Sequence, residues 1–279
     1  MLVDTHAHIH FKDYLRHVRS GINQERLGEE FSVSAMLERA SAAGIEKIIC
    51  VGTSYEDSRL AVDFVPGHDN CVATVGLHPH DAKQGRLALD RLAKLINSPK
   101  VVAVGECGLD YYYSHSPKAD QQAALRFQIE LALAHNKPLI FHVRDAPNHP
   151  SGGGATGQAF DDFFRIIDEY QEVRGVVHSF SSTIDNLEPV LKRGFYIGLN
   201  GIMTFTQAGG QLAAAKQVPL DKLVLETDCP FLTPAPKRGT INEPANVKII
   251  AQFLANLRGE AFETLAKATT KNAKELFKL

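Results

Sequence analysis

The stretch VDTHAHIH, Val3 to His10, places three histidines at alternate positions directly behind a short apolar run. Side chains of a β-strand alternate between its two faces, so His6 and His8 point to the same side and can grip one ion together. His10 shares their parity but falls beyond the strand, where the chain turns into FKDYLRH. The stretch therefore predicts a strand with two ligand histidines at its C-terminal end, and His10 as a loop residue.

Apolar runs of this kind recur along the chain and alternate with helical patterns. Segment 33–44 has apolar residues three and four apart and ends in glycine, and 118–136 is followed by Pro138, which blocks further helix. Two helices, 245–258 and 260–277, close the chain. Strands are expected at 2–5, 47–51, 71–76, 101–106, 138–143, 175–180, 195–200 and 223–228.

Eight strands alternating with helices predict a parallel sheet closed into a barrel. We expect residues 1–279 to form one α/β domain, a (β/α)8 TIM barrel with its site at the C-terminal ends of the strands. The alternative is a doubly wound open sheet, which has fewer strands and a glycine-rich first turn that is absent here. The segment 147–157 is rich in glycine and is expected to be a loop within the domain.

The composition is that of an ordinary soluble protein, with 44% apolar and 22% charged residues. A formal net charge of −2 gives no support to a broad basic face for duplex nucleic acid. The four cysteines form no CxxC pair, and no signal peptide or run of about 18 apolar residues is present. These features predict a cytoplasmic protein with reduced thiols and no membrane contact. They indicate no obligate protein partner and leave the oligomeric state open.

Imidazoles and carboxylates stand at the C-terminal ends of the expected strands, which converge on one mouth of a barrel. Divalent cations prefer these ligands, and such groups are costly to place near a core otherwise. A lone histidine at a strand end is more often structural, and salt bridging is the alternative explanation, but it would not need this many imidazoles. The set comprises His6, His8, His78, His80, Glu106, His142, His178 and Asp228.

Motifs from one end of the chain to the other resemble those of the TatD family of metal-dependent deoxyribonucleases. They are DTHAHIH, GLHPH (76–80), VGECGLDYYY (104–113), FHVRDA (141–146), VHSFSS (177–182), GLNGIMTF (198–205), LETDCPFLTP (225–234), RGTINEPANV (238–247) and NAKELF (272–277). The resemblance implies a (β/α)8 barrel that binds one to three divalent cations and hydrolyses phosphodiester bonds in DNA. His10 and the HSFSST segment depart from the usual pattern without removing a ligand.

The resemblance also implies a division of the ligands between two cations, which would be Mg²⁺, Mn²⁺ or Zn²⁺. His6, His8 and Asp228 resemble the ligands of the first cation. His142 and His178 resemble those of the second, and Glu106 resembles the carboxylate that bridges both. Glu106 and Asp228 are the expected catalytic residues, with Asp228 also accepting a proton from the attacking water.

Five further residues are candidates for substrate contacts. Arg144 lies two residues after a ligand and could bind phosphate, or it could pair with Asp145 or another acid of the barrel. Arg238, like Lys237, lies in the loop after the last strand, where exposed basic residues are usually just solvated. The other three are His78, His80 and Asn200, with support of the ligands from behind as the alternative for the histidines.

Three functions remain open. The first is a divalent-metal deoxyribonuclease that trims single-stranded DNA as an exonuclease, with DNA as its substrate. The second is a metal-dependent amidohydrolase or esterase that acts on a small molecule or an aminoacyl ester, since the same activation of water serves any electrophile. The third is a non-catalytic metal-binding scaffold, against which the intact ligand set argues.

Overall fold

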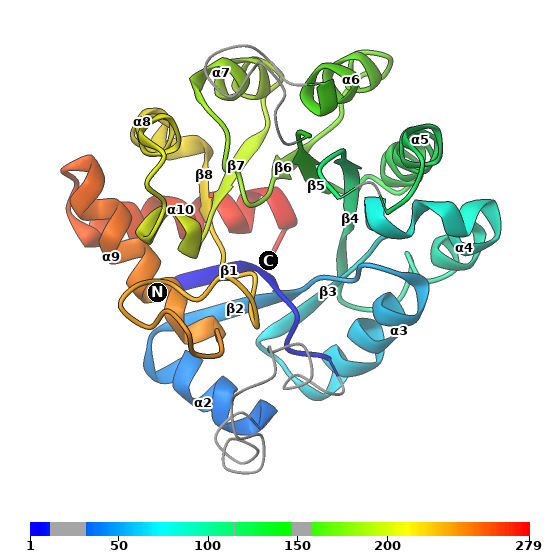
Figure 1. The fold of residues 1–279 in the computed structure, drawn as a ribbon. Coiled ribbons are helices and arrows are strands. Elements are labelled where there is room, and N and C mark those ends of the chain that lie inside the picture. Colours follow the sequence, from blue (N-terminus) through cyan, green and yellow to red (C-terminus); the bar gives the residue numbers. More distant parts are fainter. Residues whose placement is uncertain (12–31, 114, 147–157) are drawn as a thin grey trace.

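The computed structural model describes residues 1–11, 32–113, 115–146 and 158–279, and shows eight parallel strands encircled by helices (Figure 1). The strands pair in chain order from the first to the last. The ring closes where Ala7 and Cys229 form a parallel bridge. The predicted (β/α)8 barrel is therefore confirmed. The strands are β1 (Leu2–Ala7), β2 (Ile45–Cys50), β3 (Cys71–Val75), β4 (Val101–Asp110), β5 (Leu139–Arg144), β6 (Gly175–Val177), β7 (Tyr196–Leu199) and β8 (Leu223–Leu225).

The helices lie outside the strands, and short 3-10 turns connect several of them. Ser32 and Ser54 cap the first two described helices by accepting a backbone N–H, and Gly259 ends the helix Val247–Arg258 in the left-handed region at φ 69°. The helices are α2 (Val33–Ala42), α3 (Tyr55–Phe64), α4 (Gly85–Ala93), α5 (Lys118–Ala134), α6 (Gln158–Ile167), α7 (Ile184–Lys192), α8 (Gly209–Gln217), α9 (Val247–Arg258) and α10 (Phe262–Phe277). The 3-10 turns are η2 (Val65–Gly67), η3 (Pro79–Gln84), η4 (Gly201–Thr204), η5 (Leu220–Lys222) and η6 (Pro244–Asn246).

The interior of the barrel is a packed apolar core. Valine, isoleucine and alanine side chains from the strands fill it, and Leu276 and Phe277 of α10 pack against them. A larger apolar cluster lies between the strands and the outer helices. Because the interior is filled, polar side chains can collect only at the mouth formed by the strand ends.

Strand lengths differ from the prediction in a way that bears on the site. β4 continues to Asp110 instead of ending at Glu106, whereas β6 and β8 end before His178 and Asp228. Gly108 has φ 145°, and a Cβ on it would collide with the backbone of His142. β4 and β5 can therefore approach closely beside the site. The predicted loop 147–157 lies outside the described residues.

Within the described residues, no helix is both long and apolar enough to cross a membrane. Cys50, Cys71, Cys107 and Cys229 are all buried and free, as the sequence predicts for reduced thiols.

Candidate metal centre

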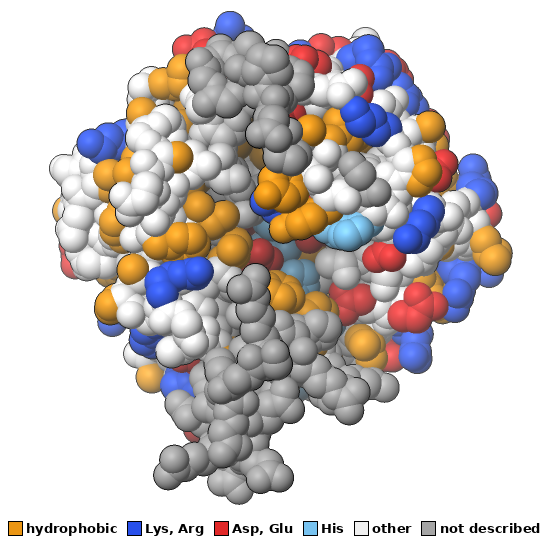
Figure 2. Space-filling view, viewed as in Figure 1, with side chains coloured by type: hydrophobic (Ala, Val, Ile, Leu, Met, Phe, Trp, Pro, Cys, Tyr) orange, Lys and Arg blue, Asp and Glu red, His pale blue; other side chains and the backbone are white. Residues whose placement is uncertain are grey.

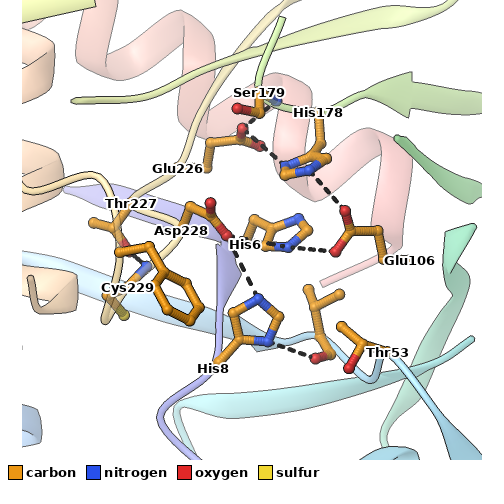
Figure 3. Close-up of polar contacts among 12 residues, drawn as sticks. His6, His8, Thr53, Glu106, His178, Ser179, Glu226, Thr227, Asp228 and Cys229 are labelled. Carbon is orange, nitrogen blue, oxygen red and sulfur yellow. Dashed lines mark hydrogen bonds and ion pairs between the residues drawn. The ribbon is translucent and has the colours of Figure 1, made fainter. Parts of the chain in front are cut away.

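The six residues predicted as ligands meet at one end of the barrel. Figure 3 shows His6 of β1 and His8, which follows β1, facing Asp228, which follows β8, and His178 facing Glu106 of β4. Asp228 Oδ1 lies 3.7 Å from His6 Nε2 and 3.5 Å from His8 Nε2. The His6 ring also stacks on the His178 ring, with centroids 3.9 Å apart. His142 joins the group from β5.

Glu106 is the carboxylate at the centre of this group. Its Oε1 lies 2.8 Å from His142 Nδ1, 2.9 Å from His178 Nε2 and 3.3 Å from His78 Nε2. Its Oε2 lies 3.3 Å from His6 Nε2. Burial alone would raise the pKa of Glu106, but the surrounding imidazoles, with His178 and His78 foremost, hold it well below its usual range. Glu106 is therefore an ionised carboxylate shared by four imidazoles.

Three of the candidate ligand histidines are oriented from behind by an oxygen atom. His142 Nε2 lies 3.0 Å from Asp110 Oδ2, and His178 Nδ1 lies 3.3 Å from Glu226 Oε1. His8 Nδ1 lies 2.9 Å from the Val51 carbonyl oxygen. An acceptor behind one ring nitrogen fixes the proton there and leaves the other nitrogen as the ligand atom. The free nitrogens face Glu106 or Asp228.

Asp110 and Glu226 were not predicted as site residues from the sequence. Asp110 lies on β4 with the same parity as Glu106, which was the available signal. It is fully buried, and besides His142 its Oδ2 lies 3.0 Å from His80 Nε2. Glu226 is also fully buried, and its Oε1 accepts the N–H of Ser179 at 2.5 Å (Figure 3).

Burial and neighbouring carboxylates pull the pKa values of the imidazoles in opposite directions. Burial lowers the pKa of His6, and it lowers that of His78 to about 4. Burial would also lower the pKa of His8, His142 and His178, but their carboxylate partners outweigh it and raise all three. The centre therefore holds both neutral imidazoles and imidazoles that retain a proton more strongly than usual.

Atoms without partners show that these residues fit a metal ion. Within the described part of the chain, Nδ1 of the fully buried His6 has no hydrogen-bond partner, and its Nε2 has only the carboxylate oxygens of Glu106 and Asp228, at 3.3 and 3.7 Å. A buried polar atom without a partner is costly, and a bound cation would remove that cost. Ligand atoms of His6, His8 and Asp228 all lie within 4.8 Å of one another, as do those of His78, Glu106 and His142. Imidazole and carboxylate donors in this number suit divalent cations.

His10 lies in a turn beyond β1, as predicted, but it is buried. Its Nε2 is 3.0 Å from Asp57 Oδ1, and the other oxygen of Asp57 accepts the N–H and hydroxyl of Thr53. His8, His10 and Asp57 also bring ligand atoms within 4.8 Å of one another. His10 is therefore part of the polar group that packs beside His8.

The candidates for substrate contacts divide into two sets. His78, His80, Arg144 and Arg238 line a cavity of about 930 Å³ over the centre, together with Glu106 and Asp228. Asn200 does not line it, because its buried amide accepts the N–H of Ile202 and donates to the hydroxyl of Ser179. Lys237 donates to Asn246 and lines a second cavity, between α2 and α9. Arg144 does not pair with Asp145, which caps α6 by accepting the N–H of Ala159 and Phe160.

Comparisons with known proteins show which family the chain belongs to. The model of the family described as TatD related DNase matches residues 3–278. The uncharacterized metal-dependent hydrolase YabD of Bacillus subtilis (strain 168) is 36% identical over 282 residues, covering 100% of both chains. The 3'-5' ssDNA/RNA exonuclease TatD of Escherichia fergusonii is 33% identical over 250 residues, covering 87% of this chain and 91% of the relative. The crystal structure of YJJV, a TatD homolog from Escherichia coli K12, has a TM-score of 0.83 at 28% identity and covers 100% of this chain and 98% of that one.

Proposed function

The chain belongs to the TatD family of metal-dependent hydrolases, and on that premise we propose that it is an exonuclease that hydrolyses phosphodiester bonds at the ends of single-stranded DNA. The observation that carries the proposal is the position of Glu106, whose two oxygens face imidazoles from both sides of the centre. One carboxylate between two ligand sets is what a site for two neighbouring cations needs.

We assign the ligands accordingly. His6, His8 and Asp228 would hold the first cation, His142 and His178 the second, and Glu106 would reach both. When bound, the cations would neutralise the charge of a phosphoryl group and make a water molecule acidic near neutral pH. This is the chemistry that an anionic phosphodiester needs most.

The protein's own groups supply the remaining parts of the reaction. Asp228 would accept the proton of the attacking water as an ionised carboxylate at the mouth. Its contacts with His8 and His6 hold its pKa below the usual value, although burial alone would raise it, and so keep it in the charged form. Arg144 and Arg238 line the cavity and are free of carboxylate partners among the described residues, so their guanidinium groups can bind phosphate oxygens.

Support for a nucleic acid substrate comes from a relative, since the E. fergusonii protein is named a 3'-5' ssDNA/RNA exonuclease. The small number of arginine side chains at the mouth fits a protein that binds a strand end and does not contact a duplex along its length. A hydrolase of amides, lactones or aminoacyl esters would use the same centre, and the volume of the cavity also suits a small molecule.

A substrate panel tests the proposal. The protein is loaded with Mg²⁺ or Mn²⁺ and incubated with end-labelled single-stranded and duplex DNA, and in parallel with amide, lactone and ester substrates. We expect single nucleotides to be released from single-stranded DNA, and His6→Ala and Asp228→Ala to lose most of that rate. The matched control is His135→Ala, because His135 contacts Asn97 away from the mouth and its loss should leave the rate unchanged.

Either of two results would contradict the proposal. In the first, the double variant His6→Ala/His8→Ala cleaves DNA like the wild type, which identifies the activity as a contaminant. In the second, the wild type turns over an amide, lactone or ester but no DNA, which assigns the same centre to a small-molecule hydrolase.

A further inference from the structure

The rim of the cavity beside His142 carries an exposed aromatic surface that the hydrolytic reaction does not use. Tyr112 and Tyr113, in the connection from β4 to α5, are 41% and 49% exposed. The Tyr113 ring is parallel to that of His115 within 2°, with centroids 5.6 Å apart. The Arg144 guanidinium lies 4.2 Å from the Tyr112 centroid and 4.9 Å from that of Tyr113. We call Tyr112, Tyr113, His115 and Arg144 the tyrosine shelf. Figure 2 shows hydrophobic side chains and histidines gathered around the central hollow of this face.

We propose that the tyrosine shelf binds a nucleobase of the single-stranded substrate by stacking, while Arg144 binds a phosphate attached to the same nucleotide. The proposal rests on the proposed nuclease function and names the feature of the substrate that the rim recognises. Aromatic side chains bind single strands because every base has a flat face, so the contact does not depend on base identity. A guanidinium that lies over a ring keeps the N–H donors at its edge available to phosphate oxygens.

The shelf has a fixed position relative to the centre because both are held by one carboxylate. Asp110 Oδ1 accepts the N–H groups of Tyr112 and Tyr113 at 2.9 and 3.0 Å. Its other oxygen lies 3.0 Å from His142 Nε2. A base stacked on the shelf is therefore held at a defined offset from the phosphate that reacts beside His142.

A second pair of an arginine and an aromatic ring lines the same cavity and comes from the segments that follow β7 and β8. The Arg238 guanidinium lies 3.8 Å from the Phe205 centroid, and its Nη1 donates to the Thr233 carbonyl oxygen. Phe205 follows η4, after β7, whereas the tyrosines of the shelf follow β4 and Arg144 is the last residue of β5. Among the described residues, neither Arg144 nor Arg238 pairs with a carboxylate. Repeated pairs of a flat ring and an unneutralised cation match the repeating base and phosphate of a single strand.

This arrangement distinguishes a base-bearing strand from one that has phosphates alone. The probes are two fluorescein-labelled oligonucleotides of about ten residues, one of thymidylate and one with an abasic tetrahydrofuran sugar at every position. Both have the same phosphates, so any preference between them reports the bases. Dissociation constants are measured by fluorescence anisotropy with the metals chelated, so that no hydrolysis occurs, and hydrolysis of both strands is measured separately with metal.

We expect the wild type to bind the thymidylate strand roughly tenfold or more tightly than the abasic one, as one or two stacked bases imply. Tyr112→Ala/Tyr113→Ala should lose most of this preference. Tyr112→Phe/Tyr113→Phe should retain it, because it keeps both rings, and both variants keep the backbone bonds to Asp110. Tyr55→Ala is the matched control, since Tyr55 also lies under an arginine, Arg91, at 3.7 Å, but outside the cavity.

Equal binding of the two strands by the wild type would overturn the proposal without any variant. A preference that survives in the double alanine variant would also overturn it. Failure of the nuclease function would give a different result. A protein that binds the base-bearing strand preferentially but hydrolyses neither strand would support base binding by the shelf and contradict the proposed exonuclease activity. Hydrolysis of both strands at equal rates would support the nuclease activity and contradict base binding by the shelf.

Discussion

Replacing Asp110 by asparagine tests whether the carboxylates behind the histidines set the metal affinity of the centre. Asp110 Oδ2 is 3.0 Å from His142 Nε2, and Glu106 Oε1 is 2.8 Å from His142 Nδ1. With a carboxylate behind it, His142 carries its proton on Nε2 and offers Nδ1 to a cation. An asparagine amide could present its NH₂ group to Nε2, which would favour the proton on Nδ1, the ligand atom.

The magnitude follows from the role of Asp110 as a partner of one ligand. Loss of such a partner costs about 10- to 100-fold in metal affinity or activity, equivalent to about 1.4–2.7 kcal/mol. The asparagine still has an oxygen that can accept the N–H groups of Tyr112 and Tyr113, so the fold should survive. We therefore expect weaker binding of one equivalent of metal and a hydrolytic rate that recovers at high metal concentration.

The assay is a titration of metal-free protein with Mn²⁺, followed by binding calorimetry and by the rate of hydrolysis at each concentration. Asp168→Asn is the matched control, because Asp168 is an exposed carboxylate paired with Arg193 at 2.6 Å on the outside of the barrel. The reasoning is refuted if Asp110→Asn melts at the wild-type temperature and binds metal with unchanged affinity. A loss that excess metal cannot restore would also contradict it, since that result implies a role in the reaction itself.

Three further predictions address the metals, the substrate and the protons. Exhaustive loading should give two equivalents of divalent metal per chain and Glu106→Ala fewer, and a wild-type protein that retains none would contradict the ligand assignment. Because Arg144 and Arg238 offer roughly two phosphate contacts, the log of affinity for a short single strand should fall with the log of salt with a slope of about −1.4, or about sevenfold from about 50 to about 200 mM. A slope near about −5, measured by anisotropy, would indicate an extended basic groove instead. Metal binding near neutral pH should release protons and weaken as pH falls, because the pKa values of His142 and His178 are raised and a ligand imidazole must be neutral. A binding enthalpy independent of buffer ionisation would exclude that release.

The positions of the candidate ligands could be predicted from the sequence because two simple geometries determine them. Alternation along a strand puts His6 and His8 on one face, and barrel closure brings the ends of distant strands to one mouth. Neither step requires knowledge of side-chain packing. Asp228 could therefore be grouped with His6 and His8 at the opposite end of the chain, and Glu106 with histidines of three other strand ends.

The residues that orient the ligands could not be found in this way because their roles depend on how far each strand continues. Asp110 reaches His142 only because β4 extends past Glu106 and, at Gly108, passes close to β5. Glu226 lies beside His178 because the backbone N–H of Ser179, beyond the end of β6, donates to the Glu226 carboxylate. These are contacts between segments whose register the apolar pattern does not specify.

The sequence alone also does not decide which group the Arg144 side chain contacts. Arg144 is next to Asp145, and pairing between them was the simplest alternative to phosphate binding. The structure instead uses Asp145 to cap α6, which satisfies backbone N–H groups that have no partner within the helix. The Arg144 guanidinium lies above the tyrosine rings instead, and this position depends on the tertiary fold.

The residues of the metal centre bear on the type of reaction, whereas those at the rim of the cavity bear on the substrate. The imidazoles and carboxylates at the centre activate water for attack on any electrophile, so they define a hydrolase and no more. In the proposed function, selection among substrates is assigned to the rim, where Arg144 and Arg238 lie over aromatic rings beside the cavity. An uncharged amide or lactone would supply no anionic partner for either guanidinium group, whereas a nucleotide strand supplies a phosphate for each and a base for the rings. The rim therefore supports the proposed nucleic acid substrate on chemical grounds that are independent of the metal centre.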